Sequence, residues 1–361
     1  MLVLVGASQA ELARDLHLDL AESGLLASLL ALGLGAGVLA AGPLVDRLPR
    51  RPLFVAATLL VASGLATVDR SMGFARAGAH LVGVGVGLGV YETLLNAAVG
   101  ELYGARAARP LLFVHAAATL GAMLGAPLAG WLTAYSDWTT AFRALGLAHL
   151  PLAAAALRTA FPPPLHATER THAGLLPPGA LARLAPFAAI AFAYVGVETA
   201  LTVLALPYAS AALGLPHARG LAAISAFWAG LLAGRLVVLP LRGAIDARHL
   251  AAAGGAGALV LAAGVASGTR AVELVFAATG LCLGLVFPVM VALTGESAGT
   301  ARATAIGLVV SAGALGGFLL PWLHGALGDV AGPGLAVGSL AAWCAVASGA
   351  ARRIRGRREG R

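Results

Sequence analysis

Long stretches without a charged residue constrain this chain more than any other feature of its sequence. Uncharged runs cover 23–45, 52–68, 110–136, 249–269, 274–295, 303–328 and 330–351, and about 20 apolar residues suffice for a helix to cross a bilayer. Four further runs include charged residues at an end or inside: 77–100, 184–206 and 220–241 carry one each, and 137–158 carries Asp137, Arg143 and Arg158. Lipid offers no water to an open backbone, and alternating strand patterns are absent. We therefore predict an all-α membrane protein with eleven full spans.

Composition excludes a water-soluble domain, because 59% of the residues are apolar and only 11% are charged. The 24 basic residues, all arginine, outnumber the 16 acidic ones. No basic stretch is interleaved with aromatic residues, so a nucleic-acid partner is not expected, and loops facing anionic lipid account for the excess charge. Most arginines outside the spans fall on the side of the C-terminal tail. We therefore expect a multi-pass protein of a bacterial-type inner (plasma) membrane with a cytoplasmic C-terminus.

Enzyme chemistry is not expected. Cys282 and Cys344 both lie inside apolar runs and exclude a disulfide framework. No nucleophile with a base and no metal-ligand set stands at membrane depth, so we expect neither a metal nor a cofactor. His115 and His324 fall within spans, where a lone histidine satisfied in a helix interface is the expected arrangement.

The chain matches itself at an offset of 195 residues. Arg47 coincides with Arg242, and Gly85, Gly89 and Glu101 coincide with glycines and a glutamate of the second half. A parallel repeat of two six-helix halves is typical of a large transporter class that binds its substrate between the halves. We predict an N-terminal helix bundle at 1–160, a cytoplasmic linker at 161–180, a C-terminal bundle at 181–351 and a basic tail at 352–361.

The first helix of this pattern is incomplete. By the same offset the span 184–206 maps to positions −11 to 11, and the stub 1–9 is too short to cross a bilayer. Two interpretations remain open: the coding start lies upstream of Met1, or the chain is a truncated remnant that does not transport.

A polar motif separates the second and third predicted helices. It comprises Gly42, Asp46, Arg47, Arg50 and Arg51. Its spacing resembles the loop signature of the major facilitator superfamily, except that Pro49 stands where that family usually has glycine. The resemblance implies a cytoplasmic gate, in which the carboxylate of Asp46 faces the positive N-terminus of the helix that starts near Arg302. A simpler interpretation is a positive-inside anchor.

Glu92 lies nine residues before Glu101, about 13 Å from the end of its span at 1.5 Å per residue. An intramembrane carboxylate is costly unless it is paired, hydrated or protonated, so Glu92 should face the bundle interior and load a proton there. Asn96, one turn later, shares its face.

The segment 91–96, with Tyr91, Glu92 and Asn96, resembles the fourth helix of the fucose–proton symporter family. The segment 194–199, with Tyr194 and Glu198, resembles its seventh helix, and 227–235, with Trp228 and Arg235, is similar to its eighth. This resemblance implies proton coupling at Glu92 and Glu198, and a substrate cavity lined by Tyr91, Asn96, Tyr194 and Trp228.

Glu198 and Arg235 each have a second interpretation. Glu198 lies 15 residues beyond Arg183, about 22 Å into its helix, where a hydrated residue near an outer vestibule is the alternative to a proton or hydroxyl site. Arg235 lies seven residues before Arg242 and can extend to the surface. We group it with the gate motif, as a gate or helix anchor.

Together these features predict a secondary active transporter that moves a small polar, sugar-like solute by alternating access with protons. A proton-driven exporter of drugs or metabolites is the alternative, besides the remnant. The expected partners are the solute, protons and the lipid bilayer, and a monomer is expected.

Overall fold

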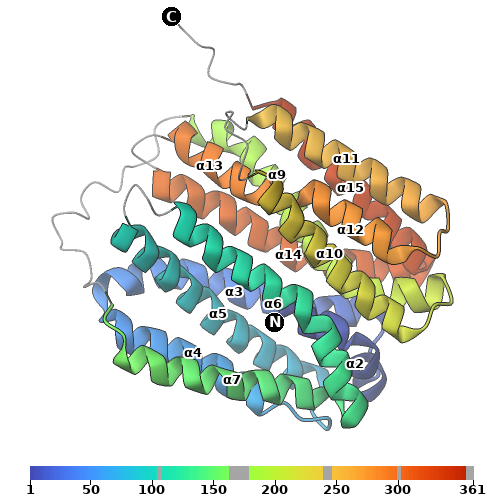
Figure 1. The fold of residues 1–361 in the computed structure, drawn as a ribbon, viewed down its shortest axis with the longest axis horizontal. Helices are drawn as coiled ribbons and strands as arrows, with labels where there is room; N and C mark the ends of the chain where they lie inside the picture. Colours follow the sequence, from blue (N-terminus) through green and yellow to red (C-terminus); the bar gives the residue numbers. More distant parts are fainter. Residues whose placement is uncertain (104–107, 162–178, 239–245, 299–301, 355–361) are drawn as a thin grey trace, which may run out of the picture.

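The computed structural model describes residues 1–103, 108–161, 179–238, 246–298 and 302–354, and these residues form helices and no strand (Figure 1). The helices are α1 (Leu2–Ala7), α2 (Gln9–Leu16), α3 (Leu20–Arg47), α4 (Arg50–Ala66), α5 (Phe74–Tyr103), α6 (Ala108–Tyr135), α7 (Trp138–Arg158), α9 (Ala180–Pro207), the π-helical η2 (Tyr208–Ala212), α10 (His217–Val238), α11 (Ala247–Ala266), α12 (Val272–Leu283), α13 (Val286–Ala298), α14 (Arg302–Ala331) and α15 (Pro333–Arg352). Ten stretches of the described chain are long and apolar enough to cross a membrane. The remaining predicted span, 52–68, corresponds to the 17-residue α4, which packs against α7.

The two halves of the chain form two bundles, α1–α7 below and α9–α15 above in Figure 1. Their helix bounds follow the repeat closely. Moving α7 by 195 residues gives 333–353, and α15 is Pro333–Arg352. Moving α6 gives 303–330, and α14 is Arg302–Ala331. The all-α fold with repeated halves is therefore confirmed. The predicted linker lies mostly outside the described residues, as does the tail from residue 355 on.

The same glycine contact occurs in both halves. In α5, a methyl group on Gly85 or Gly89 would overlap a backbone carbonyl oxygen of α3. Gly280 in α12 and Gly284, which directly follows α12, stand in the same relation to α10. Glycine lets two backbones approach each other closely, so these pairs hold α3 to α5 and α10 to α12 along equivalent faces.

The N-terminal segment is helical but short. At 1.5 Å per residue the six residues of α1 extend about 9 Å, well below the thickness of the hydrocarbon. Its side chains are buried against α9 and α6, and a methyl group on Gly6 would collide with the backbone carbonyl of Thr202 in α9. The stub therefore packs between the two halves.

One predicted span is interrupted. The run 274–295 forms two helices, because α12 ends at Leu283 and α13 begins at Val286. Pro288 has no N–H to donate to the carbonyl of Gly284, and its ring clashes with that carbonyl. A proline early in α13 and a glycine at the end of α12 together account for the break.

Candidate functional site

One face of α9 points at the opposite half of the molecule. Tyr194, Glu198 and Thr202 follow one another at intervals of four residues and therefore share a face. Thr202 contacts α1, which fixes the direction of that face. α9 is the most deeply buried of the spans, yet Glu198 remains partly accessible while Val197 and Leu201 are 1% and 0% exposed. Glu198 thus lies on the face of α9 that meets the other half, with part of its side chain accessible.

Arg235 reaches from one half into the other. It lies in the last turn of α10, and helical side chains point back toward the N-terminus of their helix. Its guanidinium accordingly extends into the membrane interior, where Nη2 donates to the hydroxyl of Tyr194 at 3.3 Å and Nη1 donates to the hydroxyl of Thr119 in α6. Its contacts in the structure are therefore interior ones, and the gate role that we predicted for it remains a prediction.

Further polar groups surround this guanidinium. Glu198 lies near enough to attract Arg235 and accepts a hydrogen bond from Tyr194. His115, one turn before Thr119, also interacts electrostatically with Arg235. Trp228 donates to the hydroxyl of Thr202 at 3.2 Å. We call this set the interbundle cluster: His115, Thr119, Tyr194, Glu198, Thr202, Trp228 and Arg235.

The structure does not join Glu92 to this cluster. The ring of Tyr91 packs inside the N-terminal bundle, 5.8 Å from the ring of Phe54 and 6.4 Å from that of His149. Glu92 is partly buried and has no hydrogen-bond or ion-pair partner among the described residues. The Oδ1 atom of Asn96 is likewise buried and accepts no hydrogen bond from them. The predicted roles of these three residues therefore remain predictions.

Only part of the gate motif can be placed. The side chains of Gly42, Asp46 and Arg47 lie outside the described part of the structure. Arg50 is buried, with 2% of its surface exposed. Arg51 donates from Nε to the backbone carbonyl of Thr159 at 3.1 Å, which joins the start of α4 to the end of α7 within one bundle.

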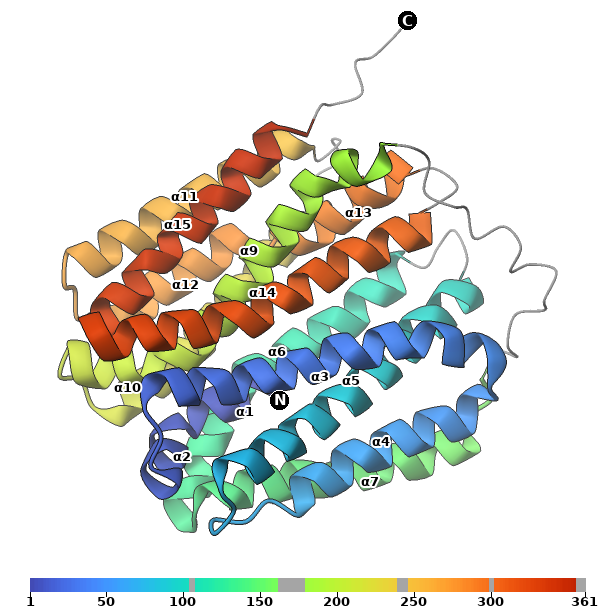
Figure 2. The ribbon, with the colours of Figure 1, turned by 180° about the vertical axis from the view of Figure 1, so that it is seen from behind.

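The two halves meet closely where α3 begins and α14 ends. A methyl group on Gly24 would overlap the backbone of Pro321, and one on Gly325 would overlap the backbone of Leu20. Figure 2 shows the two helices side by side there and separating toward the end of α3 and the start of α14. We call the first region the closed end and the opposite one, from which the C-terminal tail leaves, the tail end.

Asp329 connects the halves at the closed end. Its two carboxylate oxygens accept hydrogen bonds from the backbone N–H groups of Leu20 and Ala21, at 2.9 and 2.8 Å. These are free donors of the first turn of α3. Asp19 caps the same turn from the same half, accepting from the N–H of Glu22 at 2.7 Å. An acidic residue of α14 therefore binds the positive end of α3.

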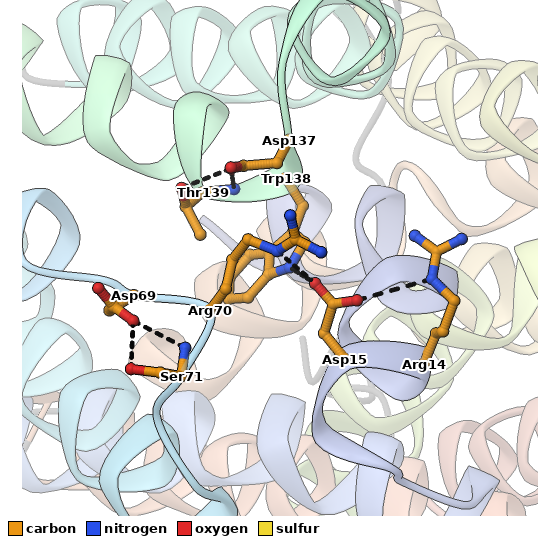
Figure 3. Close-up of polar contacts among 8 residues, drawn as sticks. All are labelled: Arg14, Asp15, Asp69, Arg70, Ser71, Asp137, Trp138 and Thr139. Atoms are coloured by element: carbon orange, nitrogen blue, oxygen red, sulfur yellow. Dashed lines mark hydrogen bonds and ion pairs between the residues drawn. The ribbon is translucent and has the colours of Figure 1, made fainter.

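A second carboxylate at the closed end ties three segments of the N-terminal half together (Figure 3). Asp15 Oδ2 accepts from Arg70 Nε at 2.8 Å and from Trp138 Nε1 at 3.0 Å. Arg70 belongs to the loop before α5, and Trp138 is the first residue of α7. The hydrogen bond from Arg70 holds the pKa of the Asp15 carboxyl below its usual range.

His324 is satisfied within the core, as expected. Its Nδ1 lies 2.9 Å from the carbonyl of Ala336, and its Nε2 accepts from Trp343 at 3.1 Å.

The sequence did not single out Thr119 as a site residue, because an isolated threonine in an apolar run forms no recognisable pattern. Among the described residues, no three or more histidine, cysteine, aspartate or glutamate side chains lie close enough together to hold a metal ion.

Comparison with known proteins defines the class of this molecule. The family model of the Major Facilitator Superfamily matches residues 1–269. The chain belongs to this superfamily and is a multi-pass membrane transporter. No curated protein sequence matches it closely.

Solved structures agree on the fold. A D-xylose–proton symporter aligns with a TM-score of 0.76 at 16% identity, over 100% of this chain and 95% of the other. The transporter FucP, in its outward conformation, aligns with a TM-score of 0.66 at 18% identity, over 98% and 97%. A bacterial homologue of the human lysosomal transporter Spinster, inward-facing and occupied, aligns with a TM-score of 0.67 at 14% identity, over 98% and 90%.

Proposed function

We propose that this protein is a secondary active transporter that moves a small polar, sugar-like solute through the space between its two halves, together with protons. The interbundle cluster carries the proposal, because it places polar groups of α6, α9 and α10 at one point between the halves. One structural neighbour is a D-xylose–proton symporter, which carries a sugar together with a proton.

Alternating access requires that the halves close first at one end and then at the other. Contact of α3 with α14 at the closed end corresponds to one of these states. In this proposal the tail end faces the cytoplasm of a bacterial-type cell, and the protein works as a monomer. The motif of Gly42, Asp46 and Arg47 holds the tail end shut in the other state, in which the closed end is open.

Glu92 and Glu198 are the proposed proton carriers. A carboxyl group without a charged partner in a dry environment favours its neutral form, and it releases the proton when its cavity opens to water. Glu92 has no such partner among the described residues, and Glu198 lies beside Tyr194 and Arg235. Glu92 is therefore suited to exchange a proton as access alternates. The charge of Arg235 favours the ionised form of Glu198, so we expect Glu198 to take up its proton when that attraction weakens.

The test uses the full chain in proteoliposomes that contain a pH-sensitive dye. We expect D-xylose or D-glucuronate to drive proton uptake by the wild type. Glu92→Gln should abolish accumulation driven by a pH gradient while counterflow exchange continues, and the exposed Glu296→Gln serves as the control. Unimpaired pH-driven accumulation by Glu92→Gln would refute proton coupling at that residue. Proton-driven efflux of amphiphilic dyes in place of solute uptake would instead identify an exporter.

A further inference from the structure

Arg235 is a buried cation whose hydrogen-bonding capacity is only partly used. Two of its nitrogens donate to neutral hydroxyl groups, those of Thr119 and Tyr194. Its Nε is buried and has no hydrogen-bond partner among the described residues. A guanidinium has five donors in a planar fork that matches a carboxylate. The group therefore keeps free donors between the two halves of a transporter.

No carboxylate of the described residues forms an ion pair with Arg235. Glu198 lies near enough to attract Arg235, but the hydrogen bond that Glu198 accepts comes from Tyr194. Because a buried charge is costly without a partner, the arginine is stabilised when an anion approaches it directly. His115 on the opposite helix adds further positive charge when it is protonated.

We propose that Arg235, with the hydroxyl groups of Thr119 and Tyr194, binds the carboxylate of a small hydroxylated organic anion, such as a sugar acid or a hydroxy acid. This proposal rests on the transport function proposed above and narrows its solute to an anion. Bidentate arginine–carboxylate pairs are strong and directional. The residues come from both halves, so the anion would link them as it binds.

Glu198 provides the coupling in this proposal. When ionised it competes with the solute carboxylate for the positive charge of Arg235, and when protonated it no longer competes. One proton and one monovalent anion therefore bind together. Their charges cancel, so the loaded carrier moves no net charge.

The ionisable groups around this site are few. α9 contributes Glu198 and Tyr194, and α6 contributes His115. On α12 the acidic residue is Glu273, which pairs with Arg219 at the closed end. α1 carries no ionisable side chain, and the buried amino group of Met1 stands directly before its first residue. Within the described residues, the ionisable groups of α13, α14 and α15 make no contact with Glu198 or Arg235.

The first experiment measures thermal stabilisation of the purified full chain by matched pairs of compounds at pH 5.5 and 7.5. The pairs are D-glucuronate and D-glucose, D-gluconate and D-glucitol, and L-lactate and 1,2-propanediol. We expect at least one carboxylate to bind about tenfold or more tightly than its neutral counterpart, and more tightly at pH 5.5. Stabilisation by no carboxylate, or equal stabilisation by the neutral partner, would overturn the proposal.

Variants identify the groups involved. Arg235→Gln should lose the preference for the anion, Arg235→Lys should retain part of it, and the exposed Arg183→Gln should behave as the wild type. Glu198→Gln should bind the anion equally well at both pH values, while Glu296→Gln keeps the pH dependence. If Arg235→Gln does not fold, Thr119→Val tests the same contact and should weaken anion binding. An unchanged pH dependence in Glu198→Gln would contradict the competition.

Transport separates this inference from the function on which it rests. In proteoliposomes, anion-driven proton uptake should be insensitive to a membrane potential imposed with valinomycin and potassium. Proton uptake driven by neutral sugars but by no carboxylate would leave the transport function standing and overturn the anion site. No proton or solute flux with any compound would remove both.

Discussion

At the scale of single residues, Asp15 shows how one carboxylate can organise a membrane protein outside its spans. It accepts hydrogen bonds from a loop arginine and from the indole of Trp138, and Arg14 approaches it at 3.6 Å. These partners stabilise the ionised form, which is why the pKa of Asp15 lies below the usual 3.8. Stability from this group is present above pH 3.8 and is lost as the pH falls through the lowered pKa.

Replacing this carboxylate should lower stability in a pH-dependent way. We expect Asp15→Asn to reduce the free energy of unfolding by about 1–3 kcal/mol at pH 7, because charge-assisted hydrogen bonds are lost. The difference from the wild type should shrink as the pH falls below the usual carboxyl pKa of 3.8. Thermal unfolding of purified protein between pH 3 and 7 measures it. A difference that stays constant over this range would contradict the assigned ionisation.

The resemblance of 194–199 and 227–235 to helices of the fucose–proton symporters singled out Tyr194, Glu198 and Trp228, and the structure brings these three into the interbundle cluster. Their roles in transport remain predictions. The intervals on α9 place two of these side chains on one face, and an intramembrane carboxylate is informative by its cost alone. The direction of Arg235 could not be predicted, since an arginine near a span end reaches either the surface or the interior, and its rotamer decides between them. The role of Thr119 could not be predicted either, because its contact with Arg235 depends on how the two bundles pack against each other.

At the scale of elements, α5 carries both glycines that contact a neighbouring helix and a glycine that contacts none, so the two kinds can be compared within one helix. Gly85 and Gly89 face the backbone of α3, whereas nothing lies within 4 Å of a methyl group placed on Gly83. We expect Gly85→Ala and Gly89→Ala to lose about 1–3 kcal/mol of stability through overpacking. Gly83→Ala should be neutral or gain up to about 1 kcal/mol through better helix propensity. Urea or thermal unfolding in detergent compares the three, and equal effects at all three positions would refute the close contact.

The helices themselves could be predicted well from the sequence, because uncharged length is a strong signal and the 195-residue repeat checks each assignment against its copy. The break between α12 and α13 could not be placed in advance. A proline removes a helical hydrogen bond, but α14 continues through Pro321, whereas α12 and α13 are separate helices near Pro288. Local packing decides whether a helix continues or breaks at a proline.

At the scale of the whole molecule, two acidic residues cap α3 but differ in which half they belong to. Asp329 acts across the interface and Asp19 acts within its own half. Removing Asp329 should therefore favour opening of the closed end, whereas removing Asp19 should weaken the helix alone. At about 2–3 kcal/mol for a charged cap with two hydrogen bonds, the equilibrium between the two states should shift roughly 30- to 150-fold.

Spin labels on cysteines that replace the exposed Ser71 and Ser267 report this opening, in a background without Cys282 and Cys344. We expect Asp329→Ala to lengthen the distance between the labels in a larger fraction of molecules, and Asp19→Ala to leave the distribution as in the wild type. Identical distributions in all three proteins would show that the carboxylate does not hold the halves together.

The interlocked glycines of α10 and α12 determine which parts can tilt separately. Because the backbones of Gly280 and Gly284 lie directly against the backbone of α10, α10 cannot slide along α12. We therefore expect the two helices to move as one rigid unit, together with Arg235. The interruption after Leu283 separates α13 from these two helices. We therefore expect α13 to change its tilt at the tail end more readily than α10 and α12, so that this end can widen while Arg235 keeps its position.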